Sequence, residues 1–242
     1  NVTPHQLVMT ATPIPRSLTM SAYADLDTSI IDELPPGRQT IETVALSNAR
    51  RDELIEKIKQ ISKEGRQIYW VCTLIEESEA LRAESAEKTF AYLSDNLKDL
   101  KVVMIHGRLT KSEKEIIMSD FASGKTNLLV ATTVIEVGVN VPNASLMTVE
   151  NSERLGLAQL HQLRGRVGRG SEKSACVLLY QSPLSQTAKE RLDILRQSND
   201  GFLIAQKDLE LRGPGEILGT QQTGIASMKI ANIVRDAYLL KE

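Results

Sequence analysis

Short apolar runs alternate with longer, mostly polar segments from Arg50 onward. The apolar runs lie at 67–73, 101–107, 127–135, 145–151 and 175–181. Apolar runs of about four to eight residues are typical of strands that are buried on both faces. The segments between and before these runs have the length of helices and lie near 50–64, 77–99, 111–123 and 157–167. This alternation predicts an α/β fold, with helices on both faces of a parallel sheet. In such sheets we expect ligands beyond the carboxyl ends of the strands.

Composition and charge narrow the function classes. The chain has 242 residues, of which 41% are hydrophobic and 25% charged, as in ordinary globular proteins. The net charge of −2 gives no overall attraction to nucleic acid, so any phosphate contact has to be local. The longest apolar stretch, 128–135, is too short to cross a bilayer, and we expect a cytoplasmic protein without a membrane partner. Cys72 and Cys176 lie in strand-like runs without metal-ligand spacing, so we expect both thiols in the core.

The stretch HQLRGRVGRG, residues 161–170, separates three arginines with glycines. On a helical wheel, one side is apolar and carries Leu157, Leu160, Leu163 and Val167, with Arg164 near it. Arg166 and Arg169 fall on a second side with Gln159 and Gln162. Guanidiniums form forked bonds to phosphate oxygens, and the three glycines would let a ligand or another backbone approach closely. An ion-pair face is the alternative, but no acidic residue lies between 157 and 171, so we favour a phosphate site.

The same stretch is similar to the last signature motif of superfamily 2 helicases. This resemblance implies a RecA-like second motor domain in which Arg166 and Arg169 are arginine fingers on the γ-phosphate of ATP, with Gln162 beside the nucleotide. The chemistry agrees, because a positive charge that reaches the developing phosphate charge is worth about a thousandfold in rate.

Three further motifs resemble the same superfamily. VMTATPIPR, residues 8–16, is similar to the motif that couples the ATP state to the grip on nucleic acid. Its hydroxyl donors would be Thr10 and Thr12, although a capped strand-to-helix turn explains this stretch locally just as well. VVMIHGRLTKSEKEIIMSDF, residues 102–121, resembles the strand, loop and helix that contact the DNA backbone through Gly107 and Arg108.

ATTVIEVGVNVP, residues 131–142, resembles a motif that serves both ligands. The resemblance implies that Thr132 and Thr133 meet a phosphate backbone and that Gly138 and Asn140 approach the nucleotide. Many relatives carry Asp where this chain has Asn140.

Four stretches together resemble the RecG family of bacterial branch-migrating helicases. They are IIDELPPGRQTI, VCTLIEESE, GVNVPNAS and DLELRGPGEILGTQQTG. The Mfd family of transcription-repair coupling translocases, which shares DLELRG, is the weaker match. Beyond residue 183 the resemblance implies a helical hairpin and loop that turn nucleotide-driven motion into translocation on double-stranded DNA. Arg191, Arg212 and Gln222 would be its functional residues, while a surface helix charge is the alternative for Arg191.

The resemblance divides the chain into three parts. We expect residues 1–45 to hold the end of a first motor domain and a linker, 46–182 the second RecA-like domain, and 183–242 the coupling hairpin and loop. Because the chain opens at Asn1 inside a motif, we expect it to be a piece of a longer, monomeric protein. Its partners would be branched or forked double-stranded DNA, the first motor domain and an N-terminal DNA-wedge domain.

The stretch SGKT, residues 123–126, imitates the end of a P-loop. A true P-loop requires glycine at position 119, where the chain has Ser119, and it lies between a strand and a helix in that order. SGKT instead follows a predicted helix, so we expect a turn. No other P-loop and no acidic DExH-type motif occurs, so ATP and Mg²⁺ would be held mainly by the first motor domain. The alternative is a catalytically silent RecA-like module that binds nucleic acid or a partner.

The purified 242-residue chain should therefore hydrolyse ATP no faster than a buffer control, because it carries no P-loop to hold the nucleotide. Phosphate release with and without forked DNA measures this. DNA-stimulated turnover by these residues alone would contradict the placement of the nucleotide on another domain.

Overall fold

The structure is a computed structural model. It describes residues 7, 29, 31, 33, 38–73, 79–132, 141–170 and 172–212, without the side chains of 79–83 and 212. The chain divides into two compact units. The larger unit spans 32–199, and the smaller unit includes the described residues 200–212.

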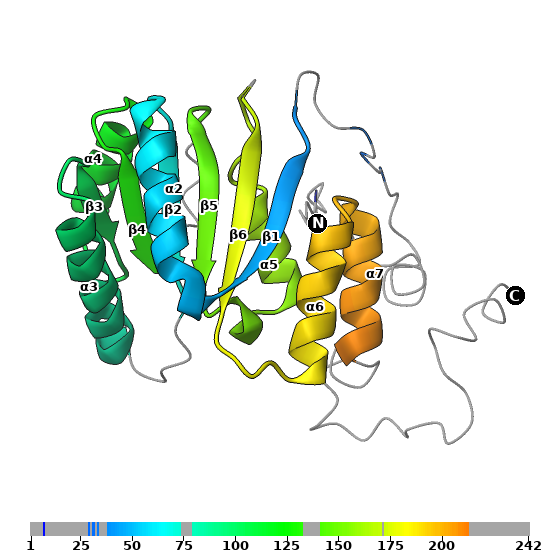
Figure 1. Cartoon of the computed structure of the whole chain (residues 1–242). Helices are drawn as coiled ribbons and strands as arrows, with labels where there is room; N and C mark the ends of the chain where they lie inside the picture. The colour runs from blue at the N-terminus through cyan, green and yellow to red at the C-terminus, as the bar shows by residue number, and fades with distance from the viewer. Residues whose placement is uncertain are drawn as a thin grey trace, which may run out of the picture. The chain divides into compact units, whose positions relative to one another are not determined.

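The larger unit is built on a sheet that has six strands among the described residues, in the order β1-β6-β5-β2-β4-β3. All neighbouring strands are parallel, and Figure 1 shows their arrowheads pointing the same way. The strands are β1 (Ile41–Ser47), β2 (Gln67–Cys72), β3 (Val102–Ile105), β4 (Leu128–Thr132), β5 (Ala144–Glu150) and β6 (Ser174–Tyr180). The predicted α/β fold with a parallel sheet is confirmed.

Helices and two short 3-10 turns lie between the strands and after β6. They are η1 (Asn48–Arg50), α2 (Arg51–Lys63), α3 (Glu79–Asn96), α4 (Lys111–Ala122), η2 (Ser152–Arg154), α5 (Leu157–Arg164), α6 (Gln186–Gln197) and α7 (Gly201–Arg212). α4 begins with a capping box, in which the Thr110 hydroxyl accepts from the Glu113 amide and the Glu113 carboxylate accepts from Thr110. No described helix is long and apolar enough to cross a membrane.

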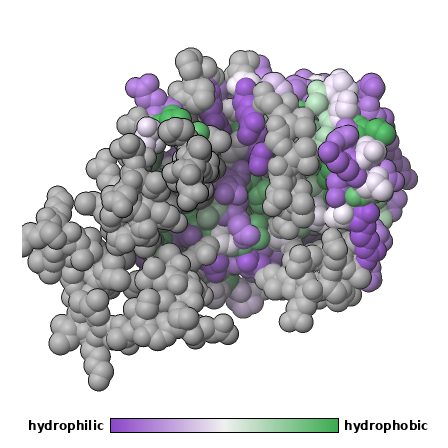
Figure 2. All heavy atoms as spheres, turned by 180° about the vertical axis from the view of Figure 1, so that it is seen from behind, coloured by the Kyte–Doolittle hydropathy of each residue, from purple (hydrophilic) through white to green (hydrophobic). Residues whose placement is uncertain are grey.

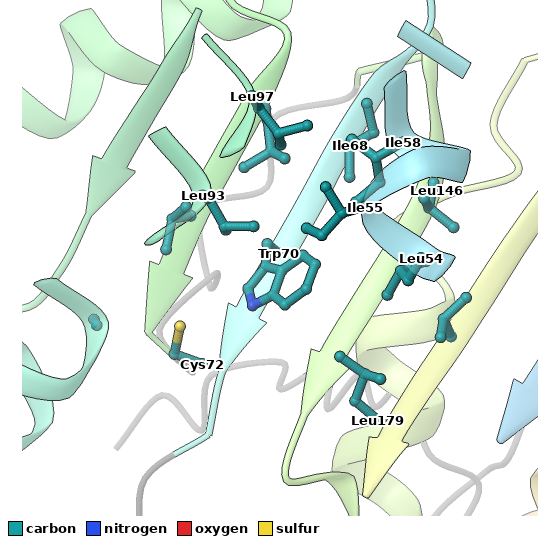
Figure 3. Packing of buried hydrophobic residues seen from close by; sticks show 14 residues of the cluster. Leu54, Ile55, Ile58, Ile68, Trp70, Cys72, Leu93, Leu97, Leu146 and Leu179 are labelled. Carbon is teal, nitrogen blue, oxygen red and sulfur yellow. The ribbon is translucent and has the colours of Figure 1, made fainter. Parts of the chain in front are cut away.

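The two faces of the sheet are covered by different helices. Trp70 of β2 is fully buried among Leu54 and Ile55 of α2 and Leu93 of α3 (Figure 3). Its neighbour Tyr69 points to the opposite face, because side chains alternate along a strand, and packs edge-on against Phe121 of α4 with ring centroids 4.9 Å apart. Figure 1 shows α2 in front of the strands and α5 behind them. Each of these large apolar side chains contributes about 1.5–3 kcal/mol when fully buried.

The strands and helices expected from 50 to 181 are found, with ends shifted by a few residues. SGKT forms the predicted turn between α4 and β4, where Gly124 has a φ of 78°. Cys72 and Cys176 are buried as predicted, and burial raises the pKa of both thiols, to about 12 for Cys176. The edge strand β1 was not predicted.

Candidate functional site

Arg166 and Arg169 of the 161–170 stretch lie on a turn, because α5 ends at Arg164. Gly165 caps the helix, and Gly168 follows in the turn with a φ of 73°, a left-handed conformation that favours glycine. The prediction that the helix continues to 167 and carries Arg166 and Arg169 on one helical face is therefore wrong. The predicted division of environments is confirmed. Leu157, Leu160, Leu163 and Val167 are buried, whereas Gln159, Gln162 and Arg169 are exposed and Arg166 is half-buried.

Arg164 differs from the other two arginines, because its side chain is buried and fully engaged with the protein. It is 2% exposed, and its Nη1 donates to the carbonyls of Leu195 and Ser198, both at 2.8 Å. The same nitrogen donates to the Thr43 hydroxyl at 3.3 Å, and Nη2 lies 3.0 Å from Nδ1 of His161. Burial lowers the pKa of Arg164 from its ordinary value. Arg164 therefore joins α5 to the end of α6.

Two glycines of the stretch accommodate the protein's own chain. A Cβ at Gly170 would lie 2.5 Å from the carbonyl oxygen of Pro142, and one at Gly168 would lie 2.8 Å from Cγ1 of Ile41. The sequence allowed either a ligand or another part of the backbone to approach these glycines closely. In the structure, it is the protein's own chain that packs against them.

These contacts place the turn at the amino ends of the strands. Ile41 is the first residue of β1, and Pro142 comes just before β5. We expected ligands beyond the carboxyl ends of the strands, whereas the turn with Arg166 and Arg169 lies at the amino ends. The reason is topological, because α5 begins after the carboxyl end of β5 and returns the chain to the start of β6.

Arg38 joins Arg166 and Arg169 at the turn. The carbonyl oxygen of Gly165 accepts from Nη2 of Arg38 at 3.2 Å and from Nε of Arg169 at 3.3 Å. Within the described part of the chain, none of the three guanidiniums has a carboxylate within 4.0 Å. Partial burial, followed by the positive charges of Arg166 and Arg38, lowers the pKa of Arg169. Such a concentration of unpaired positive charge favours an anion.

The charges of two of these arginines act on the pKa of Tyr69. Burial raises the pKa of Tyr69 to about 12, and the charges of Arg169 and Arg166 oppose that rise. The phenol therefore stays neutral near pH 7 and supplies no counter-charge to the arginines.

A family comparison agrees with this arrangement. The model described as "Helicase conserved C-terminal domain" matches residues 49–171, which include Arg166 and Arg169. The chain belongs to this helicase family. A second model, "ATP-dependent DNA helicase RecG, domain 3, C-terminal", matches residues 198–242 of the same helicase chain.

Individual relatives confirm the resemblance to the RecG family. The helicase chain is 63% identical over 240 residues to ATP-dependent DNA helicase RecG of Escherichia coli (strain K12), covering 99% of this chain and 35% of that protein. It is 46% identical over 239 residues to the RecG of Bacillus subtilis (strain 168), covering 98% and 35%. A solved structure of RecG bound to a three-way DNA junction is 44% identical and has a TM-score of 0.75, covering 95% of this chain and 30% of that one. The chain spans about a third of the length of these relatives.

Three residues of this helicase domain that we predicted to contact the DNA backbone lie at the carboxyl edge of the sheet. Gly107 and Arg108 follow β3, and Thr132 is the last residue of the adjacent strand β4. The Gly107 carbonyl accepts from Nζ of Lys114 at 3.0 Å, and Arg108 is exposed. The structure thus brings these three residues to one edge and the arginines of the turn to the other.

The carboxylate of Glu150, the last residue of β5, binds side chains of neighbouring elements at the carboxyl end of that strand. Oε1 of Glu150 pairs with Nη1 of Arg51 at 2.7 Å, and its Oε2 accepts from Nε1 of Trp70 at 3.0 Å and from the Thr89 hydroxyl at 3.2 Å. The next residue, Asn151, has a φ of 50°, a conformation that asparagine tolerates better than most residues. Sequence reasoning missed Glu150, because its partners come from three separate elements, α2, β2 and α3.

Arg191 binds the protein backbone. Its Nη1 donates to the Leu155 carbonyl at 3.0 Å, which ties α6 to the segment just before α5. Arg212 ends α7, and its side chain is not described. The predicted residues outside the described part of the chain are Thr10, Thr12, Thr133, Gly138, Asn140 and Gln222. Among the described residues, no three His, Cys, Asp or Glu side chains gather as metal ligands.

Gly170→Ala should lower the free energy of unfolding by about 1–3 kcal/mol, because the new methyl group would overlap the backbone of Pro142. Gly165→Ala is the matched control. Its Cβ would lie 3.4 Å from the nearest atom, an ordinary contact, so stability should change by less than about 1 kcal/mol. Denaturant unfolding, followed by the fluorescence of the single tryptophan, Trp70, measures both. Equal losses in the two variants would contradict the packing role of Gly170.

Arg164→Ala should lower the free energy of unfolding by about 2–4 kcal/mol, because it removes a buried guanidinium that binds the carbonyls of Leu195 and Ser198. Arg166→Ala removes a guanidinium without a described carboxylate partner and should change stability by less than about 0.5 kcal/mol. The same fluorescence experiment compares the two. If Arg166→Ala were the more damaging variant, the assignment of Arg164 to structure would be wrong.

Proposed function

We propose that this chain is the second motor domain of an ATP-dependent translocase on double-stranded DNA, which branch-migrates and remodels forked or Holliday-type DNA in recombination and replication-fork repair. One observation carries the proposal: Arg166 and Arg169 stand in a helicase motif as a cluster of guanidiniums without described carboxylate partners. The similarity to RecG over nearly the whole chain supports the DNA substrate.

At the amino edge of the sheet, the arginines act on the nucleotide. In our proposal, Arg166 and Arg169 reach the terminal phosphate of an ATP that a first motor domain holds together with Mg²⁺, with Gln162, Gly138 and Asn140 nearby. The guanidiniums stabilise the negative charge that develops on the transferred phosphoryl group. Because the two domains hold different parts of one site, hydrolysis requires them to close.

At the carboxyl edge, a second set of residues meets DNA. We assign backbone contacts to Gly107, Arg108, Thr132 and Thr133, and a nucleic-acid coupling role to Thr10 and Thr12. In this proposal, Arg191, Arg212 and Gln222 belong to a coupling element over 183–242, after a RecA-like domain over 46–182 and the end of a first motor domain with its linker over 1–45. The protein would act in the cytoplasm as a monomer, together with an N-terminal DNA-wedge domain.

Arg169→Ala in the full-length protein should lower kcat for ATP by about two to three powers of ten, with a smaller change in nucleotide binding, because it removes charge stabilisation of the transition state. DNA binding should survive. Arg169→Lys should not rescue the rate, because an ammonium cannot form the guanidinium fork. Arg212→Ala should leave DNA-stimulated ATP hydrolysis largely intact and abolish branch movement. ATPase rate and fork unwinding, measured on the same preparations, test the pair.

Arg50→Ala is a suitable control, because Arg50 is exposed and pairs only with Glu53, at 2.7 Å, in the described structure. It should leave both activities near the wild-type values. Wild-type ATP hydrolysis by Arg169→Ala would remove the arginine-finger assignment. Equal loss of both activities in Arg169→Ala and Arg212→Ala would contradict the proposed division of labour.

A further inference from the structure

Arg38 lies far from the helicase motif in sequence and beside it in space. It precedes β1, and its bond to the Gly165 carbonyl spans 127 positions of the chain. The same oxygen binds Arg169, so two guanidiniums share one neutral acceptor. Two cations that share one carbonyl leave their remaining N–H donors available to a common anion.

Most described arginines elsewhere in the chain are compensated. Those with a carboxylate within 4.0 Å are Arg50, Arg51, Arg66, Arg154 and Arg196. Arg38 is half-buried and has no such partner among the described residues, although burial normally favours pairing of a charge. Partial burial, followed by the charges of Arg166 and Arg38, lowers the pKa of Arg169, as expected where three guanidiniums lie close together.

We infer that Arg38 is a third guanidinium of the nucleotide site, which binds the terminal phosphate of ATP together with Arg166 and Arg169. This inference rests on the proposed function. The bond from Arg38 to Gly165 holds its guanidinium beside that of Arg169 before any ligand is bound. A contact that is already in place in the free protein strengthens ground-state and transition-state binding alike, so Arg38 should act mainly on KM.

The test uses the full-length protein with Arg38→Ala, Arg38→Lys and the control Arg50→Ala. Arg50 follows β1 as Arg38 precedes it, but it is exposed and pairs with Glu53 at 2.7 Å. Arg38→Ala should raise KM for ATP and the Kd of a non-hydrolysable ATP analogue about tenfold, with a smaller fall in kcat. The Kd of ADP, which lacks the terminal phosphate, should change less than about twofold. Arg38→Lys should be intermediate, since it keeps the charge and loses the fork.

Several results would overturn the inference. An unchanged Kd for the ATP analogue would reduce Arg38 to a structural bond with Gly165, and equal weakening of ADP and the analogue would exclude the terminal phosphate. Weaker DNA binding with a shallower salt dependence, at unchanged KM for ATP, would assign Arg38 to a DNA phosphate instead. If Arg38→Ala melts at a lower temperature than the wild type, the test uses Arg38→Lys with wild-type stability instead. The Kd of the ATP analogue and the Kd of ADP are then compared for that variant. Normal ATP hydrolysis by Arg169→Ala would instead refute the arginine-finger assignment on which the inference rests, whatever Arg38 does.

Discussion

The close approach of Gly170 to the backbone of Pro142 is the constraint on which the arginine site depends. Only a residue without a side chain fits there, since a Cβ would lie 2.5 Å from a carbonyl oxygen. Gly168 adds a second contact of the same kind against Ile41 and turns the chain with a left-handed φ. Together the two glycines seat the turn on the amino ends of β5 and β1. Arg169, between the two glycines, and Arg166, two residues before Gly168, are therefore positioned by packing rather than by ion pairs.

The arginines of this one short motif lie in two different environments. Arg164 is buried, and two carbonyls at 2.8 Å compensate its charge, so it is part of the structure. Arg166 and Arg169 stand two and five positions later in the chain, where the turn leaves them more exposed and without described carboxylates. Figure 2 shows, from behind, hydrophilic surface on the side of the sheet opposite to α2. A motif with three similar arginines thus combines one structural and two chemically available guanidiniums.

The sequence predicted the sheet well, because its strands are continuous apolar runs that no amphipathic helix imitates. β1 was not predicted, because IETVALS is a half-exposed edge strand in which Glu42 and Val44 face solvent. The end of α5 was misplaced because Val167 is buried and keeps the apolar period of the helix, although α5 has already ended at Arg164 with Gly165 as its cap. Arg166 and Arg169 could be found from residue types and their spacing. Arg38 could not, because its neighbours lie 127 positions away and no local pattern carries that contact.

The two edges of the sheet are joined by hydrogen bonds as well as by strands. Arg164 binds the carbonyls of Leu195 and Ser198 at the end of α6, and Arg191 of α6 binds the Leu155 carbonyl just before α5. These bonds hold α6, at its middle and at its end, to both ends of α5, so a shift of the turn with Arg166 and Arg169 would strain them. Packed, doubly fastened elements transmit displacement because they have few alternative arrangements. In the proposed motor, a pull on the arginines by a nucleotide phosphate would reach the last turn of α6, immediately before the coupling element continues into α7.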